Sequence, residues 1–118
     1  MTTQDIANDL VALCREGKFG ESGEKYWADD VLSVEPMGDN PQSRGIAAAR
    51  GKGEWWVNNH DIHGVEVEGP YVNGDQFVVR FKMDVTPKAS GQRMTVDEMG
   101  VYTIKAGKIA EERFFHGG

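Results

Sequence analysis

The hydrophobic pattern of this chain changes its period near the middle. In the first half apolar residues recur at helical spacing, as Ile6, Leu10 and Cys14 do. In the second half they alternate with other residues over runs of strand length, and in the run 77–84 they occupy every odd position. Helices followed by a meander of strands indicate an α+β protein whose helices cover one face of an antiparallel sheet.

Local motifs predict where these elements begin and end. Thr2 and Asp5 have the spacing of a capping box, which predicts the start of a helix that ends near Gly17. Asn73-Gly74 and Ala106-Gly107 predict tight turns between strands. Two further helices are expected at about 22–28 and 46–58, and strands at about 31–35, 65–68, 77–84, 94–104 and 108–116.

The length and charge of the chain exclude several classes of protein. Its 118 residues suffice for one domain, because a second would have too little chain to bury its own core. The net charge of −6 disfavours unspecific binding to nucleic acid or to an anionic membrane. The first residues lack the basic and apolar stretches of a signal peptide, and no apolar run approaches the roughly 20 residues of a membrane helix. We therefore expect a soluble cytoplasmic protein without nucleic-acid or membrane partners.

Two stretches resemble a known superfamily. The first is Ala28-Asp29-Asp30, followed after four residues by Glu35-Pro36-Met37-Gly38-Asp39-Asn40-Pro41, and the second is the closing run 101–115 with its Ala106-Gly107 turn. In residue type and spacing they resemble the nuclear-transport-factor-2-like superfamily, which includes SnoaL-like cyclases and steroid Δ-isomerases. The resemblance implies a single SnoaL-like domain over residues 1–118. Its fold would be a cystatin-like α+β roll, a cone-shaped, curved antiparallel sheet with three helices on its concave face.

The same resemblance implies a role for Glu35, and it shows that two hydrogen-bond donors of steroid isomerases have no counterpart in this sequence. In steroid isomerases the carboxylate at this position is the general base, so Glu35 is expected to lie where a base would lie. Those enzymes also donate hydrogen bonds to the developing oxyanion from a tyrosine of the first helix and from an aspartate of a later strand. Here the first helix has no aromatic residue, and Gly100 aligns with the aspartate. Because the loss of one such donor costs about 10²–10³ in rate in a known case, we do not expect a true steroid isomerase.

Alternation along the last two strands puts acids on the face that the fold would turn toward a pocket. Glu98 shares the inner face of one strand with Tyr102, and Glu112 shares the inner face of the next with Phe114 and His116. Burial disfavours the charged form of a carboxyl group, and neighbouring acids push their pKa values apart. The expected catalytic residues are therefore Glu35 as base and a protonated Glu98 or Glu112 as hydrogen-bond donor. The expected ligand-binding residues are Trp27, Trp56, Tyr102, Phe114 and His116.

Simpler roles remain open for several of these residues. A register shift of one residue would turn Glu98 and Glu112 outward, where Arg80, Arg93 or Arg113 could pair with them. Glu35 could be a strand-end residue that is hydrogen-bonded to the following turn. Of the adjacent Trp55 and Trp56, one is expected in the core and the other at the wall or rim of a pocket, and Trp27 also suits packing alone.

The sequence predicts neither a metal site nor a cofactor. His60 and His63 have a spacing that suits metal binding on a helix, but they fall where a helix gives way to a strand, so their rings should not converge. Cys14 lies on an apolar helical stripe and is expected to be a core residue rather than a nucleophile. Gly51-Lys52-Gly53 lacks the fingerprint of a phosphate-binding loop.

Three functions remain compatible with these observations. The first is an enzyme that moves a proton on a small, largely apolar molecule, as an isomerase, cyclase or hydratase would, with Glu35 as base. The second is a binding module for such a molecule without turnover. The third is an interaction module that forms a homodimer through the outer sheet face, which carries Thr95, Asp97 and Met99.

Overall fold

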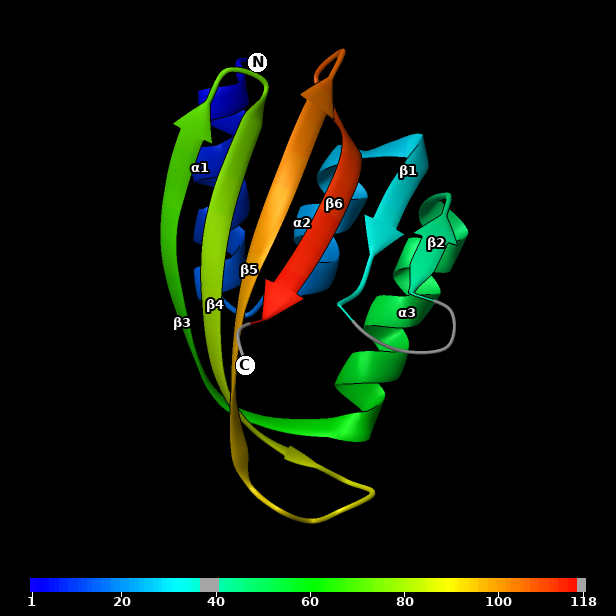
Figure 1. Cartoon of the computed structure of the whole chain (residues 1–118), viewed down its shortest axis with the longest axis vertical. Coiled ribbons are helices and arrows are strands. Elements are labelled where there is room, and N and C mark those ends of the chain that lie inside the picture. Colours follow the sequence, from blue (N-terminus) through cyan, green and yellow to red (C-terminus); the bar gives the residue numbers. More distant parts are fainter. Residues whose placement is uncertain (37–40, 117–118) are drawn as a thin grey trace.

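Three helices and six strands make up the part of the chain that the structure describes (Figure 1). The structure is a computed structural model that describes residues 1–36 and 41–116, without the side chain of His116. The predicted turn residues 37–40 lie outside the described residues. The helices are α1 (Thr3–Arg15), α2 (Phe19–Tyr26) and α3 (Ile46–Asn59). The strands are β1 (Trp27–Val34), β2 (Gln42–Arg44), β3 (His60–Asn73), β4 (Gln76–Pro87), β5 (Met94–Lys105) and β6 (Lys108–His116).

All six strands form one curved, open sheet in the order β2-β1-β6-β5-β4-β3, with the helices on its concave face (Figure 1). The predicted α+β roll is therefore confirmed. Four of the five neighbouring strand pairs are antiparallel, but β1 and β6 run parallel, so the expectation of an entirely antiparallel sheet is wrong at this pair. These two strands share no hairpin, and hence no tight turn imposes opposite directions on them.

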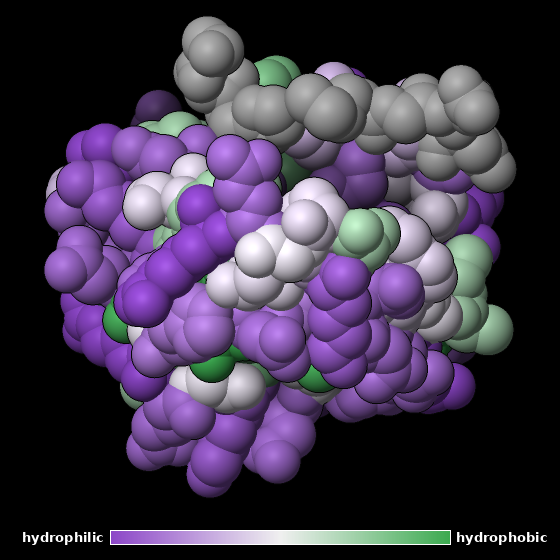
Figure 2. Space-filling model, turned by 90° about the horizontal axis from the view of Figure 1, so that it is seen from below, coloured by the Kyte–Doolittle hydropathy of each residue, from purple (hydrophilic) through white to green (hydrophobic). Residues whose placement is uncertain are grey.

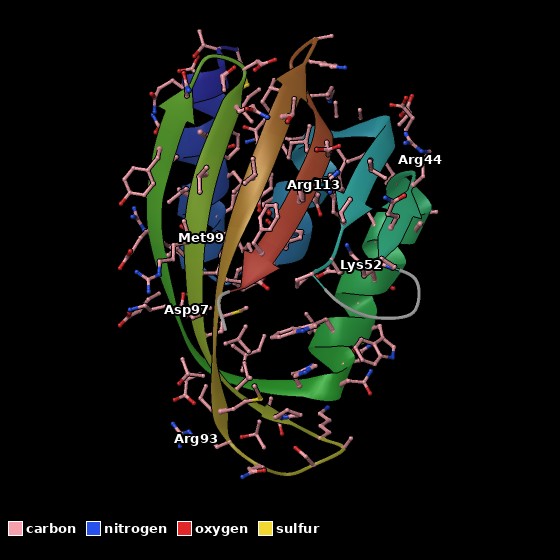
Figure 3. The ribbon with its side chains drawn as sticks, in the orientation of Figure 1. Arg44, Lys52, Arg93, Asp97, Met99 and Arg113 are labelled. Atoms are coloured by element: carbon pink, nitrogen blue, oxygen red, sulfur yellow. The ribbon has the colours of Figure 1, made fainter. Side chains whose placement is uncertain are left out.

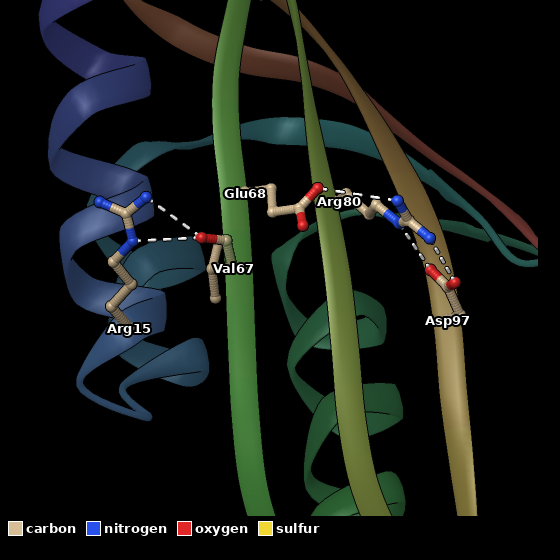
Figure 4. A network of polar contacts seen from close by, with 5 residues as sticks. All are labelled: Arg15, Val67, Glu68, Arg80 and Asp97. Atoms are coloured by element: carbon tan, nitrogen blue, oxygen red, sulfur yellow. Dashed lines mark hydrogen bonds and ion pairs between the residues drawn. The ribbon is translucent and has the colours of Figure 1, made fainter.

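The first helix begins where the capping box predicts. The Thr2 hydroxyl accepts a hydrogen bond from the backbone N–H of Asp5, whose carboxylate accepts one from the N–H of Thr2. Arg15, in the last turn of α1, donates hydrogen bonds of 3.1 and 3.2 Å to the carbonyl oxygen of Val67 on the edge strand β3 (Figure 4). The helix thus covers the inner side of that edge. Its buried residues are Ile6, Ala7, Leu10, Val11 and Cys14.

Several boundaries differ from the predicted ones. β1 begins at Trp27, four residues earlier than expected, because this residue already pairs with β6. β3 starts at His60 and continues past Gly69-Pro70, because its pairing with β4 resumes after a local break in register. Its turn consists of Gly74 and Asp75, so the tight turn lies one residue later than the sequence predicts. These differences lengthen the sheet without changing which face of it is buried.

The register of the closing hairpin decides between the two orientations left open for its acids. Tyr102 on β5 lies opposite Glu112 on β6, and both side chains are buried on the concave face. Glu111, the neighbour of Glu112, instead faces outward, where it forms an ion pair of 3.5 Å with Arg113. The shifted register, in which Glu112 would pair with an outer arginine, is therefore wrong.

The surface of the molecule is mostly polar at one end. Viewed from the end that carries the β4–β5 turn, the coloured surface is largely hydrophilic with small, separate apolar patches (Figure 2). Scattered apolar side chains of this kind are ordinary on a folded domain. In residues 1–36 and 41–116, no helix combines the length and the apolar character needed to cross a membrane.

Candidate acid–base site on the concave face

Glu112 is a buried carboxyl group with a hydrogen-bond donor at each oxygen. The residue is 7% exposed. Trp27 of β1 donates its indole N–H to Oε1 at 2.6 Å, and the Ser33 hydroxyl donates to Oε2 at 2.7 Å. Burial raises the pKa of Glu112, and these two hydrogen bonds oppose that effect. Both oxygens are accordingly occupied as acceptors by the protein itself.

Lys52 of α3 joins Glu112 to Glu35, the residue that follows β1. The Lys52 ammonium lies 2.7 Å from Oε1 of Glu35 and also donates a hydrogen bond to the Ser33 hydroxyl. It lies 5.7 Å from the centre of the Phe114 ring, within the range of a cation–π interaction. Lys52 extends from α3 on the side that faces the end of β1 (Figure 3). The side chains of Lys52 and Glu35 are 24% and 35% exposed, so the ion pair is only partly shielded from water.

The donor and acceptor capacities of these groups give the chain of hydrogen bonds a direction. An ammonium and an indole N–H can only donate. The Ser33 oxygen therefore accepts from Lys52, and its own proton points to Glu112. This arrangement suits an ionised Glu112 whose charge is balanced by Lys52 through one hydroxyl group, although burial alone favours the protonated form.

Glu98 is a second acid of the concave face whose environment differs from that of an ordinary glutamate. It is partly buried on β5, and burial together with the nearby Glu35 carboxylate raises its pKa to about 7, while Lys52 acts in the opposite direction. Glu35 and Glu98 therefore lie within electrostatic reach of one another in different environments. Such a pair can present one ionised and one protonated carboxyl group near neutral pH.

The position aligned with the aspartate of steroid isomerases is filled by aromatic rings. A Cβ atom on Gly100 would lie 3.0 Å from the Tyr102 ring and 3.1 Å from the Phe114 ring. Tyr102 is itself buried, with its ring stacked on Phe77 at a centroid distance of 4.8 Å. An aspartate at position 100 would have no space without movement of both neighbouring rings, so an oxyanion donor cannot come from this position.

The residues predicted to contact a ligand differ in their burial and in their partners within the protein. Trp56 is partly buried and stacks on the His60 ring at 4.1 Å, whereas Trp55 is 62% exposed. Trp27 is committed to packing and to its hydrogen bond with Glu112. The backbone of His116 pairs with β5, but its side chain lies outside the described part of the chain.

The two histidines that suit a metal site on a helix contact different partners. His60 stacks on Trp56 at the end of α3, and the His63 ring lies 2.8 Å from the Thr86 hydroxyl on β4. Within residues 1–36 and 41–116, no group of three or more potential ligands among His, Cys, Asp and Glu is arranged to hold a metal ion. Cys14 is buried in the core, and burial raises the pKa of its thiol to about 11, which disfavours a nucleophilic thiolate.

Two surface hollows lie outside the cluster around Glu112, since neither is lined by Glu35, Glu98 or Glu112. One, of about 720 Å³, is lined mainly by β1, β6 and the β5–β6 turn, with Arg44 and Lys108 among its residues. The other, of about 260 Å³, is lined by Arg80, Asp97, Met99 and Phe115. An apolar ligand pocket on the concave face therefore stays a prediction that depends on the residues described above.

Similarity to known proteins settles the family. The model of the SnoaL-like domain family matches residues 1–116. The chain belongs to the SnoaL-like domain family. A solved structure from Mesorhizobium loti, provisionally assigned as a SnoaL-like polyketide cyclase, shares 55% identity with it. The two superpose with a TM-score of 0.95, over 98% of this chain and 100% of that one.

More distant solved structures share the fold of this SnoaL-like domain. A Xanthomonas campestris protein of unknown function with a cystatin-like fold is 18% identical, with a TM-score of 0.81 over 100% of this chain and 92% of that one. TerC, co-crystallized with polyporic acid, is 18% identical, with a TM-score of 0.73 over 98% and 91% of the two chains. No curated protein matches the chain.

Sequence reasoning missed Lys52 and Ser33 in the site of this SnoaL-like domain. A usable indication for Lys52 was present, because it follows Ala49 by three residues and precedes Trp56 by four, on the stripe that α3 buries. A charged side chain on such a stripe requires a partner. For Ser33 the sequence offers no comparable indication, since serines are mostly exposed in folded proteins and an uncharged hydroxyl on a strand does not by itself call for a partner.

Proposed function

We propose that this SnoaL-like domain is an enzyme that moves a proton on a small, largely apolar molecule, as an isomerase, cyclase or hydratase does. Glu35 acts as the general base, and protonated Glu98 donates a hydrogen bond. The observation that carries the proposal is the presence of Glu35 and Glu98 within electrostatic reach on one face, with the pKa of Glu98 raised to about 7 by burial and by Glu35. Glu112 is the weaker candidate for the donor, because both of its oxygens already accept hydrogen bonds.

The chemistry that suits this pair is proton abstraction next to a carbonyl group. The Glu35 carboxylate takes the proton as the C–H bond breaks, and the electron pair of that bond passes to the carbonyl oxygen as an enolate. Glu98 in its acid form can donate a hydrogen bond to this oxygen, as the missing tyrosine and aspartate do in steroid isomerases. TerC, which shares the fold, was co-crystallized with polyporic acid, which supports a small-molecule ligand for this fold.

The test compares Glu35→Gln with the parent protein and with a control, Glu54→Gln, which alters an exposed carboxylate of α3. A thermal-shift screen of enones, phenols, steroids and fatty-acid-like compounds first identifies a ligand class, and turnover is then assayed on its enolisable members. We expect Glu35→Gln to reduce turnover by about 10²-fold or more, while Glu54→Gln changes little. Equal turnover in all three proteins would eliminate Glu35 as the base. Binding without turnover in the parent protein would favour the binding module.

We also propose that the outer sheet face pairs two copies of this chain. Met99 and Phe115 are 36% and 49% exposed there, and they border the hollow of about 260 Å³ beside Arg80 and Asp97. Arg80 bonds both oxygens of Asp97, at 3.0 and 2.7 Å (Figure 4). Apolar side chains around internally paired charges suit a self-complementary contact. Analytical ultracentrifugation at micromolar concentration should show a dimer, and a monomer would refute the pairing.

A further inference from the structure

Lys52 is the cation that the inner-face carboxylates share. Burial raises the pKa of both Glu98 and Glu112, and the Lys52 ammonium lowers both. Its direct ion pair is with Glu35, at 2.7 Å, and its link to Glu112 runs through the Ser33 hydroxyl. The ammonium is thus positioned by contacts on β1, β6 and the segment after β1.

An ammonium group has three N–H donors, and two of them are accounted for. One bonds Glu35 and another bonds Ser33. The side chain keeps 24% of its surface exposed, and the Phe114 ring lies beside the ammonium at 5.7 Å. Among residues 1–36 and 41–115 the ammonium has no third hydrogen-bond partner, so its third donor can serve a ligand that lies against the aromatic ring.

From this geometry we propose that Lys52 binds a negatively charged oxygen of the ligand, so that the site accepts apolar molecules bearing an acidic hydroxyl group or an enolisable carbonyl group. The proposal deepens the proposed function and rests on it for the catalytic step. When Glu35 takes a proton from the ligand, the carboxylate beside Lys52 becomes neutral as negative charge forms on the ligand oxygen. The ammonium then exchanges the Glu35 carboxylate for the ligand oxygen as its anionic partner. Its hydrogen bond to this oxygen is charge-assisted, and such a bond is about twice as strong as a neutral one.

Substituted phenols of similar size and different acidity are the probe, because a bound phenolate absorbs at a longer wavelength than a bound phenol. We expect the parent protein to bind the more acidic phenols as phenolates at a pH below their solution pKa. Lys52→Met should weaken this binding by about 10- to 100-fold and leave the bound phenol neutral. Lys88→Met is the matched control, because Lys88 is exposed in the β4–β5 turn.

Glu35→Gln should have the opposite effect on phenolate affinity. It removes the anion that competes for Lys52, so phenolates should bind about tenfold more tightly to this variant. If Lys52→Met fails to fold by circular dichroism, the Glu35→Gln arm and a Lys52→Arg variant decide the question, since arginine keeps the positive charge. Neutral binding of all phenols in the parent protein, or no tightening in Glu35→Gln, would overturn the proposal.

The two proposals fail in different ways. Phenolate binding that depends on Lys52, together with full turnover in Glu35→Gln, would keep the anion site and remove Glu35 as the base. Loss of turnover in Glu35→Gln, together with neutral phenol binding in the parent protein, would keep the base and remove the role of Lys52.

Discussion

Replacement of Glu98 by glutamine should stabilise the protein, and the gain in stability over the parent should be larger at alkaline pH than at acidic pH. The pKa of this carboxyl group rises from the ordinary 4.5 to about 7 in the folded protein, mainly because of burial and then because of Glu35. The folded state therefore binds the proton more tightly than the unfolded state. Stability contributed by this group is complete below pH 4.5 and is lost as the pH rises through 7.

The magnitude follows from the two pKa values. A difference of about 2.5 between 4.5 and 7, at 1.36 kcal/mol for each pKa unit, corresponds to at most about 3 kcal/mol above pH 8. Glutamine stays neutral at every pH and avoids this cost. For a domain of this size 1 kcal/mol changes the melting temperature by about 4 °C, so the advantage of Glu98→Gln should grow by up to about 12 °C between pH 4 and pH 8.

The assay is thermal unfolding of both proteins at intervals across that pH range. Glu112, whose pKa burial also raises, titrates in both proteins, and its effect cancels in their difference. Glu66→Gln, an exposed carboxylate on β3, is the control and should give a constant offset. Parallel curves for the parent and Glu98→Gln would refute the argument, because they would mean that Glu98 ionises in the folded protein as it does in the unfolded chain.

Two further substitutions test the packing and the outer face. Gly100→Ala places a methyl group 3.0 and 3.1 Å from the rings of Tyr102 and Phe114, and we expect a loss of about 1–3 kcal/mol in the free energy of unfolding, measured by urea denaturation. An unchanged midpoint would mean that the rings move aside at no cost. Met99→Glu puts a charge on the proposed dimer surface and should shift sedimentation toward the monomer at micromolar concentration, while the melting temperature stays close to that of the parent.

Much of the fold could be predicted from local pattern. The Thr2–Asp5 capping box defines the start of α1, and helical spacing identifies its buried stripe. Alternation with a turn at Ala106-Gly107 predicts the face of Tyr102 and Glu112, because neighbouring side chains of a strand point to opposite sides of the sheet. These features depend on residues close together in the chain, so the sequence alone determined them.

The candidate site depends on contacts that no local pattern contains. Trp27 and Glu112 are 85 residues apart, and Lys52 and Ser33 are 19 apart on different elements. Their meeting requires the parallel pairing of β1 with β6 and the placement of α3 against the end of β1, which tertiary packing alone decides. The sequence determined that acids face the concave side of a SnoaL-like sheet. Only the folded structure decided which acid is paired, because burial, hydrogen-bond donors and the Lys52 ammonium come from elements distant in the chain.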